Sequence, residues 1–359
     1  MKIRGGVFFL FLVQVVLFVW SLEHFAYGAM LTYSFDDGHI SVYDVAYPIL
    51  QEYGQVGTAN IVTNSILEHW PSKMTIDQLA ELESNGWEIT SHSKAHPHFS
   101  QIPLTYDDEI LFTNWSKLPD KNFTYQSTDY TYKELKLVVE NGEPLKRVYS
   151  VSRVEEVPGS FYFDATTKTL YVHTSNSDDP TNYEIRSDSV ERELAMSKED
   201  LINMGFDVNS FIVPYSDWHE GMPEIAAKYY DSVGAGYHDG YLNDIPPDNV
   251  YWLARRPVLN DITVDEVKSW IQEAIDEDKW LILMFHEIGD PPADDPWPEG
   301  WWSEENLKSL VSWVADQDIL VVTQQQGVEL ASVPLPSSSL LVLAGTGLLS
   351  FVRRRLRKK

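Results

Sequence analysis

A pair of adjacent carboxylates near the start of the chain could take part in metal-dependent chemistry. Asp36 and Asp37 follow Leu31–Phe35, a largely apolar run that predicts a buried strand. Neighbouring side chains of an extended chain point in different directions, so one carboxylate can bind a metal ion while the other faces a reacting centre. Alone, an Asp-Asp-Gly sequence is more typical of a turn in solvent, so the pair needs support from a second motif.

Two histidines provide that second motif. His92 and His96 lie four residues apart and directly follow Trp87–Thr90, which also predicts a strand. At that spacing both imidazoles can reach one ion from a single turn of chain. Together with a carboxylate they offer one hard oxygen and two nitrogens, and they leave open positions for water and substrate. The same ligand types occur in non-haem iron oxygenases, which are the alternative from a different enzyme class.

The elements that must position these residues alternate between strands and helices. Capping boxes at Thr75–Gln78 and Thr263–Glu266 predict two helix starts. Further strands are expected at 59–62, 210–213, 280–285 and 319–322 and near Val233, and further helices at 42–53, 190–204, 223–230 and 304–315. Strands separated by helices imply βαβ units and a parallel sheet, and so many of them suggest a barrel. In such barrels the functional residues lie where the strands end.

The alternation breaks between residues 104 and 187, where we expect a small β-rich insertion in the barrel. Short aromatic and β-branched runs at 148–151, 160–163 and 170–173 predict strands, and Asp164–Lys168 predicts a hairpin loop. The tyrosines of this segment have two interpretations, as the core of the insertion or as a surface that contacts sugars. The sequence does not separate the two.

Taken together, the Asp-Asp-Gly and His-x-x-x-His motifs resemble those of the polysaccharide deacetylases with a NodB homology domain, carbohydrate esterase family 4. The resemblance runs from Leu31 to about Val322 and is interrupted by the insertion. It implies an α/β fold, a NodB-type distorted (β/α) barrel built from residues 30–103 and 188–331. It also implies metal-dependent hydrolysis of N-acetyl groups on an extracellular or cell-envelope polysaccharide, with release of acetate. The alternative is a catalytically weak or inactive carbohydrate-binding or biofilm-matrix protein on the same fold.

Carried over residue by residue, the resemblance assigns roles to most of the motif residues. Asp36 becomes the general base. Three residues become the ligands of a divalent ion, most often zinc: Asp37, His92 and His96. The apolar strand Leu281–Phe285 matches the last motif of the family and makes His286 the general acid.

The third motif of the family is matched only in part. Phe211–Tyr215 resembles it, and in the family the residue after the proline offers a backbone N–H to the developing oxyanion, which assigns that role to Tyr215. The arginine of this motif is absent, and Ser216 replaces its glycine. In some branches an arginine of a later strand orients the base, and Arg255 is the candidate here, with Arg256 on the opposite face of the strand. A surface salt bridge would explain either arginine equally well.

Tryptophans near the motifs could stack on sugar rings. Those that we assign to substrate binding are Trp218, Trp252 and Trp301. Trp297 and Trp302 lie with Trp301 in a Pro- and Asp-rich loop directly after His286. Burial in the core is the default expectation for each tryptophan.

The N-terminal end of the chain carries the pattern of an export signal. Lys2 and Arg4 precede an apolar run, Val7–Trp20, and small residues follow near Gly28. This order of segments predicts a secretory signal peptide over residues 1–29. An uncleaved membrane anchor is the alternative.

Residues 332–359 resemble a PEP-CTERM sorting signal of Gram-negative bacteria. Pro334-Leu335-Pro336 and three serines lead into an apolar stretch, Leu340–Val352, and six basic residues follow it. Leu335 stands where such signals usually have Glu. The resemblance implies processing by an exosortase-type enzyme, transient membrane association, and location in the periplasm, on the outer cell surface or in the extracellular matrix. A plain C-terminal anchor is the alternative.

The charge of the chain excludes some classes of function. The chain has 359 residues, no cysteine, and 54 acidic against 27 basic side chains. A phosphate backbone needs a basic surface, so we exclude nucleic acid as a partner. Without the eight cations of the two ends and Glu23, 19 basic and 53 acidic side chains remain. Such a surface repels anionic polymers, so we expect a neutral N-acetylated polysaccharide as substrate.

Overall fold

A buried pair of parallel strands forms the centre of the main sheet. The computed structural model describes residues 28–217, 220–236 and 240–332. β1 (Met30–Phe35) pairs in parallel with β17 (Trp280–Phe285) on one side and with β2 (Gly57–Ile61) on the other. All six residues of β17 are buried, which explains why its sequence is continuously apolar rather than alternating.

The main sheet contains ten strands that form a nearly closed barrel. Eight of them follow one another in the order β14 (Leu242–Asn243), β17, β1, β2, β3 (Glu88–Ser91), β12 (Ser210–Ile212), β13 (Ser232–Gly236) and β15 (Leu253–Ala254). β16 (Arg256–Pro257) pairs with β17, and β20 (Leu320–Val321) pairs with β1. Because β15 pairs with β13 while β16 pairs with β17, the chain around Arg255 contacts both edges of the sheet. The predicted distorted (β/α) barrel is confirmed.

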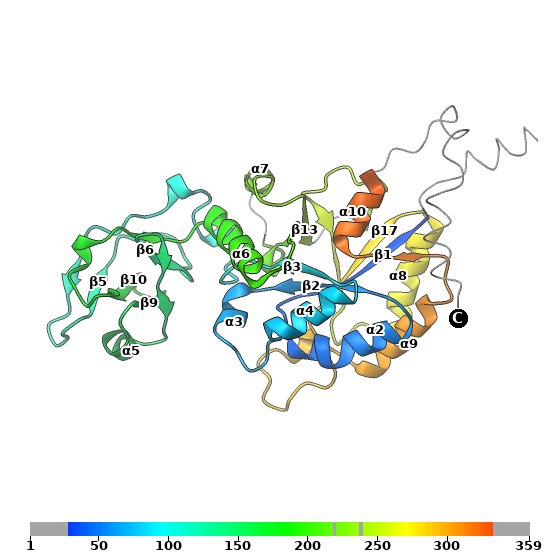
Figure 1. Cartoon of the computed structure of the whole chain (residues 1–359), viewed down its shortest axis with the longest axis horizontal. Helices are drawn as coiled ribbons and strands as arrows, with labels where there is room; N and C mark the ends of the chain where they lie inside the picture. The colour runs from blue at the N-terminus through cyan, green and yellow to red at the C-terminus, as the bar shows by residue number, and fades with distance from the viewer. Residues whose placement is uncertain (1–27, 218–219, 237–239, 333–359) are drawn as a thin grey trace, which may run out of the picture.

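Helices pack around this sheet, most of them where the sequence predicted them (Figure 1). α4 (Ile76–Ser84) and α8 (Val264–Asp276) begin at the predicted capping boxes of Thr75 and Thr263. The other helices around the barrel are α2 (Tyr47–Glu52), α3 (Thr63–Leu67), α6 (Val190–Met204), α7 (Met222–Ala226), α9 (Glu304–Val314) and α10 (Gln324–Ser332). Of these, α3 and α10 were not predicted, because neither has a clear apolar period.

The predicted helix at 42–53 is divided into a π-helical turn and an α-helix. A π-helical turn, η1 (Val42–Ala46), leads into α2, and Tyr47 donates its backbone N–H to the carbonyl oxygen of Val42. Pro48 has no N–H, so it fits only in the first turn of a helix, and α2 begins one residue before it.

Two further sheets, built from residues 104–187, lie at one end of the molecule beyond α6 (Figure 1). We call residues 104–187 the insertion. Its first sheet has the order β4 (Ser116–Lys117), β5 (Tyr125–Ser127), β10 (Thr169–His173), β9 (Ser160–Asp164) and β8 (Lys146–Arg147). Its second sheet has the order β11 (Ile185–Ser187), β6 (Val138–Glu140) and β7 (Glu143–Pro144). Phe112, Tyr130 and Phe161 belong to an apolar cluster within this segment, so part of its aromatic content is core.

Two of the three strands predicted in the insertion are confirmed. β9 and β10 form a hairpin through the predicted loop at Asp164–Lys168. The strand predicted at 148–151 is wrong, because β8 ends at Arg147 and Val151 begins α5 (Val151–Glu156). Ser150 caps this helix by accepting a hydrogen bond from the backbone N–H of Arg153. The cap favours a helix here although the β-branched residues of the segment favour a strand.

Trp280 packs between the sheet and α10. It is fully buried, and its Nε1 donates to Thr32 Oγ1 at 3.0 Å. The ring faces Gly327 of α10, where an added Cβ would lie 2.4 Å from a ring carbon. That separation is far shorter than a van der Waals contact, so α10 can lie against Trp280 only with glycine at this position.

Replacing Gly327 by alanine should therefore destabilise the protein. Alanine favours a helix over glycine by about 1 kcal/mol, but overpacking against a buried ring costs about 1–3 kcal/mol. We expect a lower urea midpoint than in the parent protein, measured by tryptophan fluorescence. Glu329→Ala, an exposed change on the same helix, is the control and should stay within about 0.5 kcal/mol. Equal midpoints for the two variants would contradict this description of the packing.

Candidate active site

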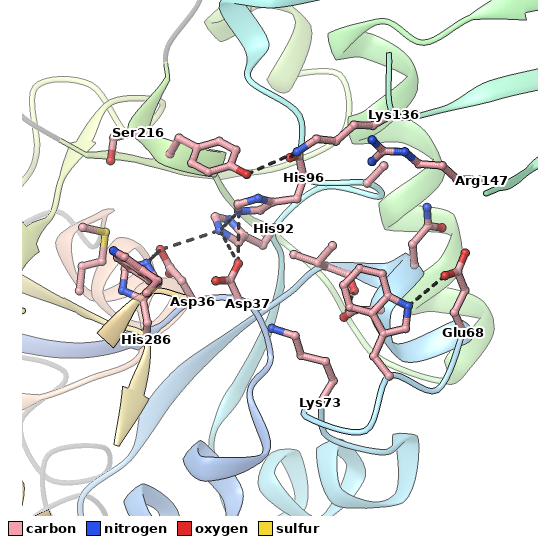
Figure 2. Close-up of a pocket in the computed structure, with 18 of the residues that line it drawn as sticks. Asp36, Asp37, Glu68, Lys73, His92, His96, Lys136, Arg147, Ser216 and His286 are labelled. Carbon is pink, nitrogen blue, oxygen red and sulfur yellow. Dashed lines mark hydrogen bonds and ion pairs between the residues drawn. The ribbon is translucent and has the colours of Figure 1, made fainter. Parts of the chain in front are cut away.

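A cavity of about 680 Å³ lies at the carboxyl ends of the barrel strands (Figure 2). The predicted site residues on its wall come from four separate segments of the chain. Asp36 and Asp37 follow β1, and His286 follows β17. The remaining predicted residues on its wall come from the segments after β3 and β12: His92, His96 and Tyr215. The barrel therefore brings together motif residues that are up to 250 positions apart in the sequence.

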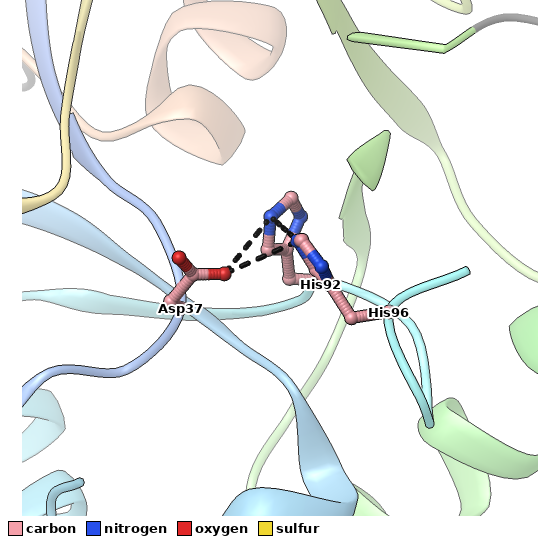
Figure 3. Close-up of side chains that lie close together, drawn as sticks. All are labelled: Asp37, His92 and His96. Carbon is pink, nitrogen blue, oxygen red and sulfur yellow. Dashed lines mark hydrogen bonds and ion pairs between the residues drawn. The ribbon is translucent and has the colours of Figure 1, made fainter. Parts of the chain in front are cut away.

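Asp37, His92 and His96 form a cluster that could hold a metal ion (Figure 3). His96 Nε2 lies 3.2 Å from Asp37 Oδ1 and 3.1 Å from His92 Nε2, and His92 Nε2 lies 3.6 Å from the same oxygen. His92 Nδ1 lies 2.9 Å from the carbonyl oxygen of Ile212, so it carries the proton and leaves Nε2 free to ligate.

The protonation states of this cluster suit a cation. Burial lowers the pKa of His96 to about 3, which keeps that ring neutral. Burial alone would raise the pKa of Asp37, but the neighbouring His96 and a hydrogen bond from His39 hold it well below its usual range. Two imidazole nitrogens and one ionised carboxylate are a donor set that fits a divalent ion such as zinc.

The backbone at the cluster is strained. Asp37, Ser93 and His96 all have positive φ angles, of 70°, 71° and 56°. Residues other than glycine rarely adopt this region, and such strain tends to occur where surrounding contacts hold a functional geometry. Two of the three cluster residues, Asp37 and His96, have this backbone conformation, and Ser93 directly follows the third.

Asp36 is almost fully buried beside the cluster and is held by two donors. Its Oδ1 accepts hydrogen bonds from Arg255 Nη2 and from Asn60 Nδ2, each at 2.5 Å. Burial alone would raise the pKa of Asp36, but the charge of Arg255 and the nearby His92 lower it. Both contacts engage Oδ1, so Oδ2 is the oxygen directed to the cavity, 3.9 Å from the Nε2 atoms of His92 and His286.

His286 lies across Asp36 from the metal cluster (Figure 2). Its ring packs edge-on against Trp297, with centroids 4.6 Å apart and planes at 89°. Burial lowers the pKa of His286, and the charge of Asp36 opposes that shift. Its Nδ1 is buried without a hydrogen-bond partner among the described residues.

Tyr215 has a left-handed backbone that the sequence did not indicate. Its φ is 57° and that of Ser216 is 53°. Its phenol ring stacks on His98, with centroids 3.8 Å apart and parallel planes, and lies edge-on to the His96 ring at 4.3 Å. The third motif therefore covers one side of the metal cluster with an aromatic ring.

Neither of the two predicted tryptophans that the structure describes lines the cavity. Trp252 and Trp301 are half-buried and are not among the described residues that line it, and Trp218 lies outside the described residues. Trp301 is turned away by a hydrogen bond from its Nε1 to Asp295, and Trp302 is core. Trp297 of the same loop does line the cavity.

Sequence reasoning missed several residues around the cavity. His39 Nε2 lies 3.5 Å from Asp37 Oδ2, and its Nδ1 lies 3.0 Å from Glu287 Oε1. His39 therefore contacts the carboxylate oxygen of Asp37 that is not directed to the histidines of the cluster. The position of His39 directly after Asp-Asp-Gly was the signal that could have found it. Trp70 and Lys73 line the cavity from the loop before α4. Residues of the insertion also line it, and no local pattern in the sequence marks them.

The N-terminal part of the chain matches a known family. The family model of polysaccharide deacetylases matches residues 28–134. A putative polysaccharide deacetylase of Bacillus subtilis, YxkH, is 31% identical over 100 residues, which are 28% of this chain and 34% of that protein. The chain therefore matches about a third of the length of this curated relative.

Several solved structures of deacetylases also align with the chain. The Streptococcus pyogenes deacetylase PplD aligns at 15% identity over 66% of this chain and 68% of that chain, with a TM-score of 0.38. The family 4 carbohydrate esterase of Streptomyces lividans aligns at 11% identity over 84% and 97%, with a TM-score of 0.39. The Xyl-CE4 domain of a xylanase from the hindgut metagenome of Trinervitermes trinervoides aligns at 13% identity over 84% and 90%, with a TM-score of 0.41.

The matched segment contains much of the site described above. Asp36, Asp37, His92 and His96 lie within it, whereas Tyr215, Arg255 and His286 lie beyond it. The comparisons thus show that residues 28–134 are similar to polysaccharide deacetylases.

Proposed function

We propose that this protein is a metal-dependent polysaccharide deacetylase that hydrolyses N-acetyl groups of an exported N-acetylhexosamine polymer. The observation that supports this most directly is the convergence of two histidines and a carboxylate beside Asp36, whose Oδ2 faces the same cavity as His286. Amide hydrolysis needs an activated water, stabilisation of an oxyanion and a proton for the leaving amine. The cavity offers a group for each requirement.

The site would hold its divalent ion, for which zinc is our choice, with Asp37, His92 and His96. Once bound, such an ion supplies a Lewis acid for the acetyl carbonyl and lowers the pKa of a water molecule. His39 holds the outer oxygen of Asp37, and the Ile212 carbonyl holds the outer nitrogen of His92, so both ligands are oriented before the ion binds.

Asp36 serves as the general base in this proposal. Its Oδ1 is committed to Asn60 and Arg255, so Oδ2 accepts the proton of the attacking water as the new C–O bond forms. The lowered pKa of Asp36 keeps this carboxylate ionised at neutral pH. Arg255 does not reach the cavity and acts only through Asp36, so it is a positioning residue.

His286 serves as the general acid. When the C–N bond breaks, its Nε2 donates a proton to the departing amine, and the proton taken up by Asp36 can restore it. The ring of Trp297 packs against the ring of His286, with the two ring planes perpendicular. The backbone N–H of Tyr215 is assigned to the oxyanion, in line with the resemblance of its motif.

Export of the protein is also part of the proposal. The predicted signal peptide and sorting segment, at 1–29 and 332–359, fall outside the described residues except for positions 28, 29 and 332. Within the described part of the chain, no helix is both long and apolar enough to cross a membrane. We propose that both end segments direct export and that an exosortase-type enzyme acts on the second. The protein itself would then be located in the periplasm, on the outer cell surface or in the extracellular matrix of a Gram-negative bacterium.

Removal of the metal ligands should separate metal binding from proton transfer. His92→Ala and Asp37→Ala should each lose bound zinc and acetate release from N-acetylglucosamine oligomers, and a chelator should have the same effect on the parent protein. His286→Ala should keep zinc but lose about 10²- to 10⁴-fold in kcat, because only the proton donor is removed. Metal content by mass spectrometry and an acetate assay provide the two readouts.

An exposed histidine supplies the control for this experiment. His69→Ala, outside the cavity, should change neither zinc content nor acetate release. Acetate release that survives in metal-free His92→Ala would overturn the mechanism. A complete zinc site without acetate release from any acetylated polymer would instead favour the carbohydrate-binding alternative.

Arg255 should influence the pH below which the enzyme loses activity. Because its charge lowers the pKa of Asp36, Arg255→Met should raise that pKa. Asp36 must be ionised to act as base, so activity should be lost at a higher pH than in the parent protein when the pH is lowered. The pH profile of kcat/KM measures this shift, and circular dichroism checks that the variant is folded.

Arg256→Met is the matched control for this change. Arg256 follows directly in the chain, and its guanidinium stacks on Trp270 at 3.8 Å, away from Asp36. Arg256→Met should therefore leave the acidic limb of the pH profile of kcat/KM unchanged. If Arg255→Met lowers activity equally at every pH, Arg255 has no influence on the ionisation of Asp36.

A further inference from the structure

The insertion contributes one wall of the catalytic cavity. Lys136, Arg147 and Tyr149 of the insertion line it together with the metal cluster. Figure 2 shows Lys136 and Arg147 on this wall. Lys136 Nζ reaches across and donates to the carbonyl oxygen of His96 at 2.5 Å. The insertion therefore contacts the ligand loop itself, and any polymer that reaches the metal must also pass this wall.

Exposed aromatic rings gather around the cavity. Four of its lining residues are large aromatics with much of their surface in solvent: Trp70 at 43%, Tyr149 at 69%, Tyr215 at 51% and Trp297 at 41%. Exposed apolar surface that collects at one groove is typical of a ligand-binding site. Flat rings at several points along the cavity suit a chain of sugar rings longer than one residue.

The charge of the cavity wall differs from that of the molecule. Over the whole chain, acidic side chains outnumber basic ones 54 to 27, yet three cations and three carboxylates line the cavity. Two of the carboxylates are committed, Asp36 to Arg255 and Asp37 to the metal cluster. What remains on the wall is mainly cationic: Lys73, Lys136 and Arg147 against Glu68.

Arg147 is the cation with the fewest partners. Lys136 is paired with Glu134 at 3.2 Å, and Lys73 lies against His39 at 3.1 Å. For Arg147 the described residues provide no ion pair, and its guanidinium lies 5.5 Å from the centre of the Tyr149 ring. A guanidinium is a bidentate donor for carboxylate, and here it stands beside an exposed ring at the cavity.

We propose that Arg147 and Tyr149 form a subsite for a sugar that bears a carboxylate, adjacent to the acetylated sugar in the polymer. Tyr149 stacks on the sugar ring and Arg147 pairs with its carboxylate. The proposal rests on the proposed function, since it takes the cavity to be a polysaccharide site. It replaces the expectation of a wholly neutral polymer, which considered only the total charge of the chain.

Binding of defined oligosaccharides tests the subsite. The probe is a hyaluronan hexasaccharide, in which N-acetylglucosamine alternates with a carboxylated sugar, compared with the same hexasaccharide after reduction of its carboxyl groups. Titration calorimetry on the zinc-loaded protein should give at least about tenfold tighter binding of the carboxylated form. Arg147→Ala should abolish this preference, whereas Tyr149→Ala should weaken the binding of both forms.

Lys146→Ala is the matched control. Lys146 is the preceding residue of β8, carries the same charge, is exposed, and points to the opposite face of the strand. It should keep the preference for the carboxylated form. The subsite is overturned if the parent protein binds both forms equally, if Arg147→Ala weakens both equally, or if Lys146→Ala reproduces the loss.

Acetate release is measured separately on the same proteins. If the parent protein deacetylates a neutral N-acetylglucosamine oligomer but shows no carboxylate preference, the subsite fails and the proposed function stands. If it shows an Arg147-dependent preference but releases no acetate, the subsite stands and the proposed function fails.

Discussion

The buried ion pair between Arg255 and Asp36 connects the closure of the barrel to its chemistry. Arg255 is fully buried at the point where β15 and β16 contact the two edges of the sheet. A buried carboxylate without a partner would be protonated, and a buried guanidinium without one would be strongly destabilising. The pair therefore requires the barrel to close at this residue, and closure in turn fixes the oxygen of Asp36 that faces the cavity.

The metal cluster depends on supports from outside its own loop. Glu193 of α6 accepts hydrogen bonds from the backbone N–H groups of Lys94 and Ala95, each at 2.8 Å, and Lys136 of the insertion holds the carbonyl of His96. These contacts surround two residues with positive φ, so they help to hold the strained turn in place. The insertion is thus part of the support of the site as well as part of its wall.

Local sequence signals explain how much could be predicted. β17 is apolar throughout because it is buried on both faces, and the helices at Thr75 and Thr263 begin where a side chain can satisfy free N–H groups. The two ligand motifs follow strands and were placed together by the parallel topology. Each of these inferences needs only a few neighbouring residues.

The features that could not be predicted depend on contacts between distant segments. Arg147 lines the cavity from β8 of the insertion and Trp70 from the loop before α4, and nothing in either local sequence indicates this. Trp252 and Trp301 do not line the cavity, and local sequence could not show this, because Trp301 makes its hydrogen bond with Asp295 rather than facing the cavity as Trp297 does. The left-handed turn at Tyr215 likewise has no local turn sequence to indicate it, and the Tyr215 ring stacks on His98, more than 100 positions earlier in the chain.

The acidic surface and the cationic wall act at different distances. At physiological ionic strength, charges more than about 8 Å apart in solvent are largely screened, so the acidic surface affects the approach of a polymer more than its binding inside the cavity. Within the proposed subsite, direct pairing with Arg147 decides the affinity. Deacetylation creates an ammonium group close to Lys136 and the metal cluster, and like charges repel there. The carboxylate of the neighbouring sugar is unchanged by the reaction, so its pairing with Arg147 persists in the product.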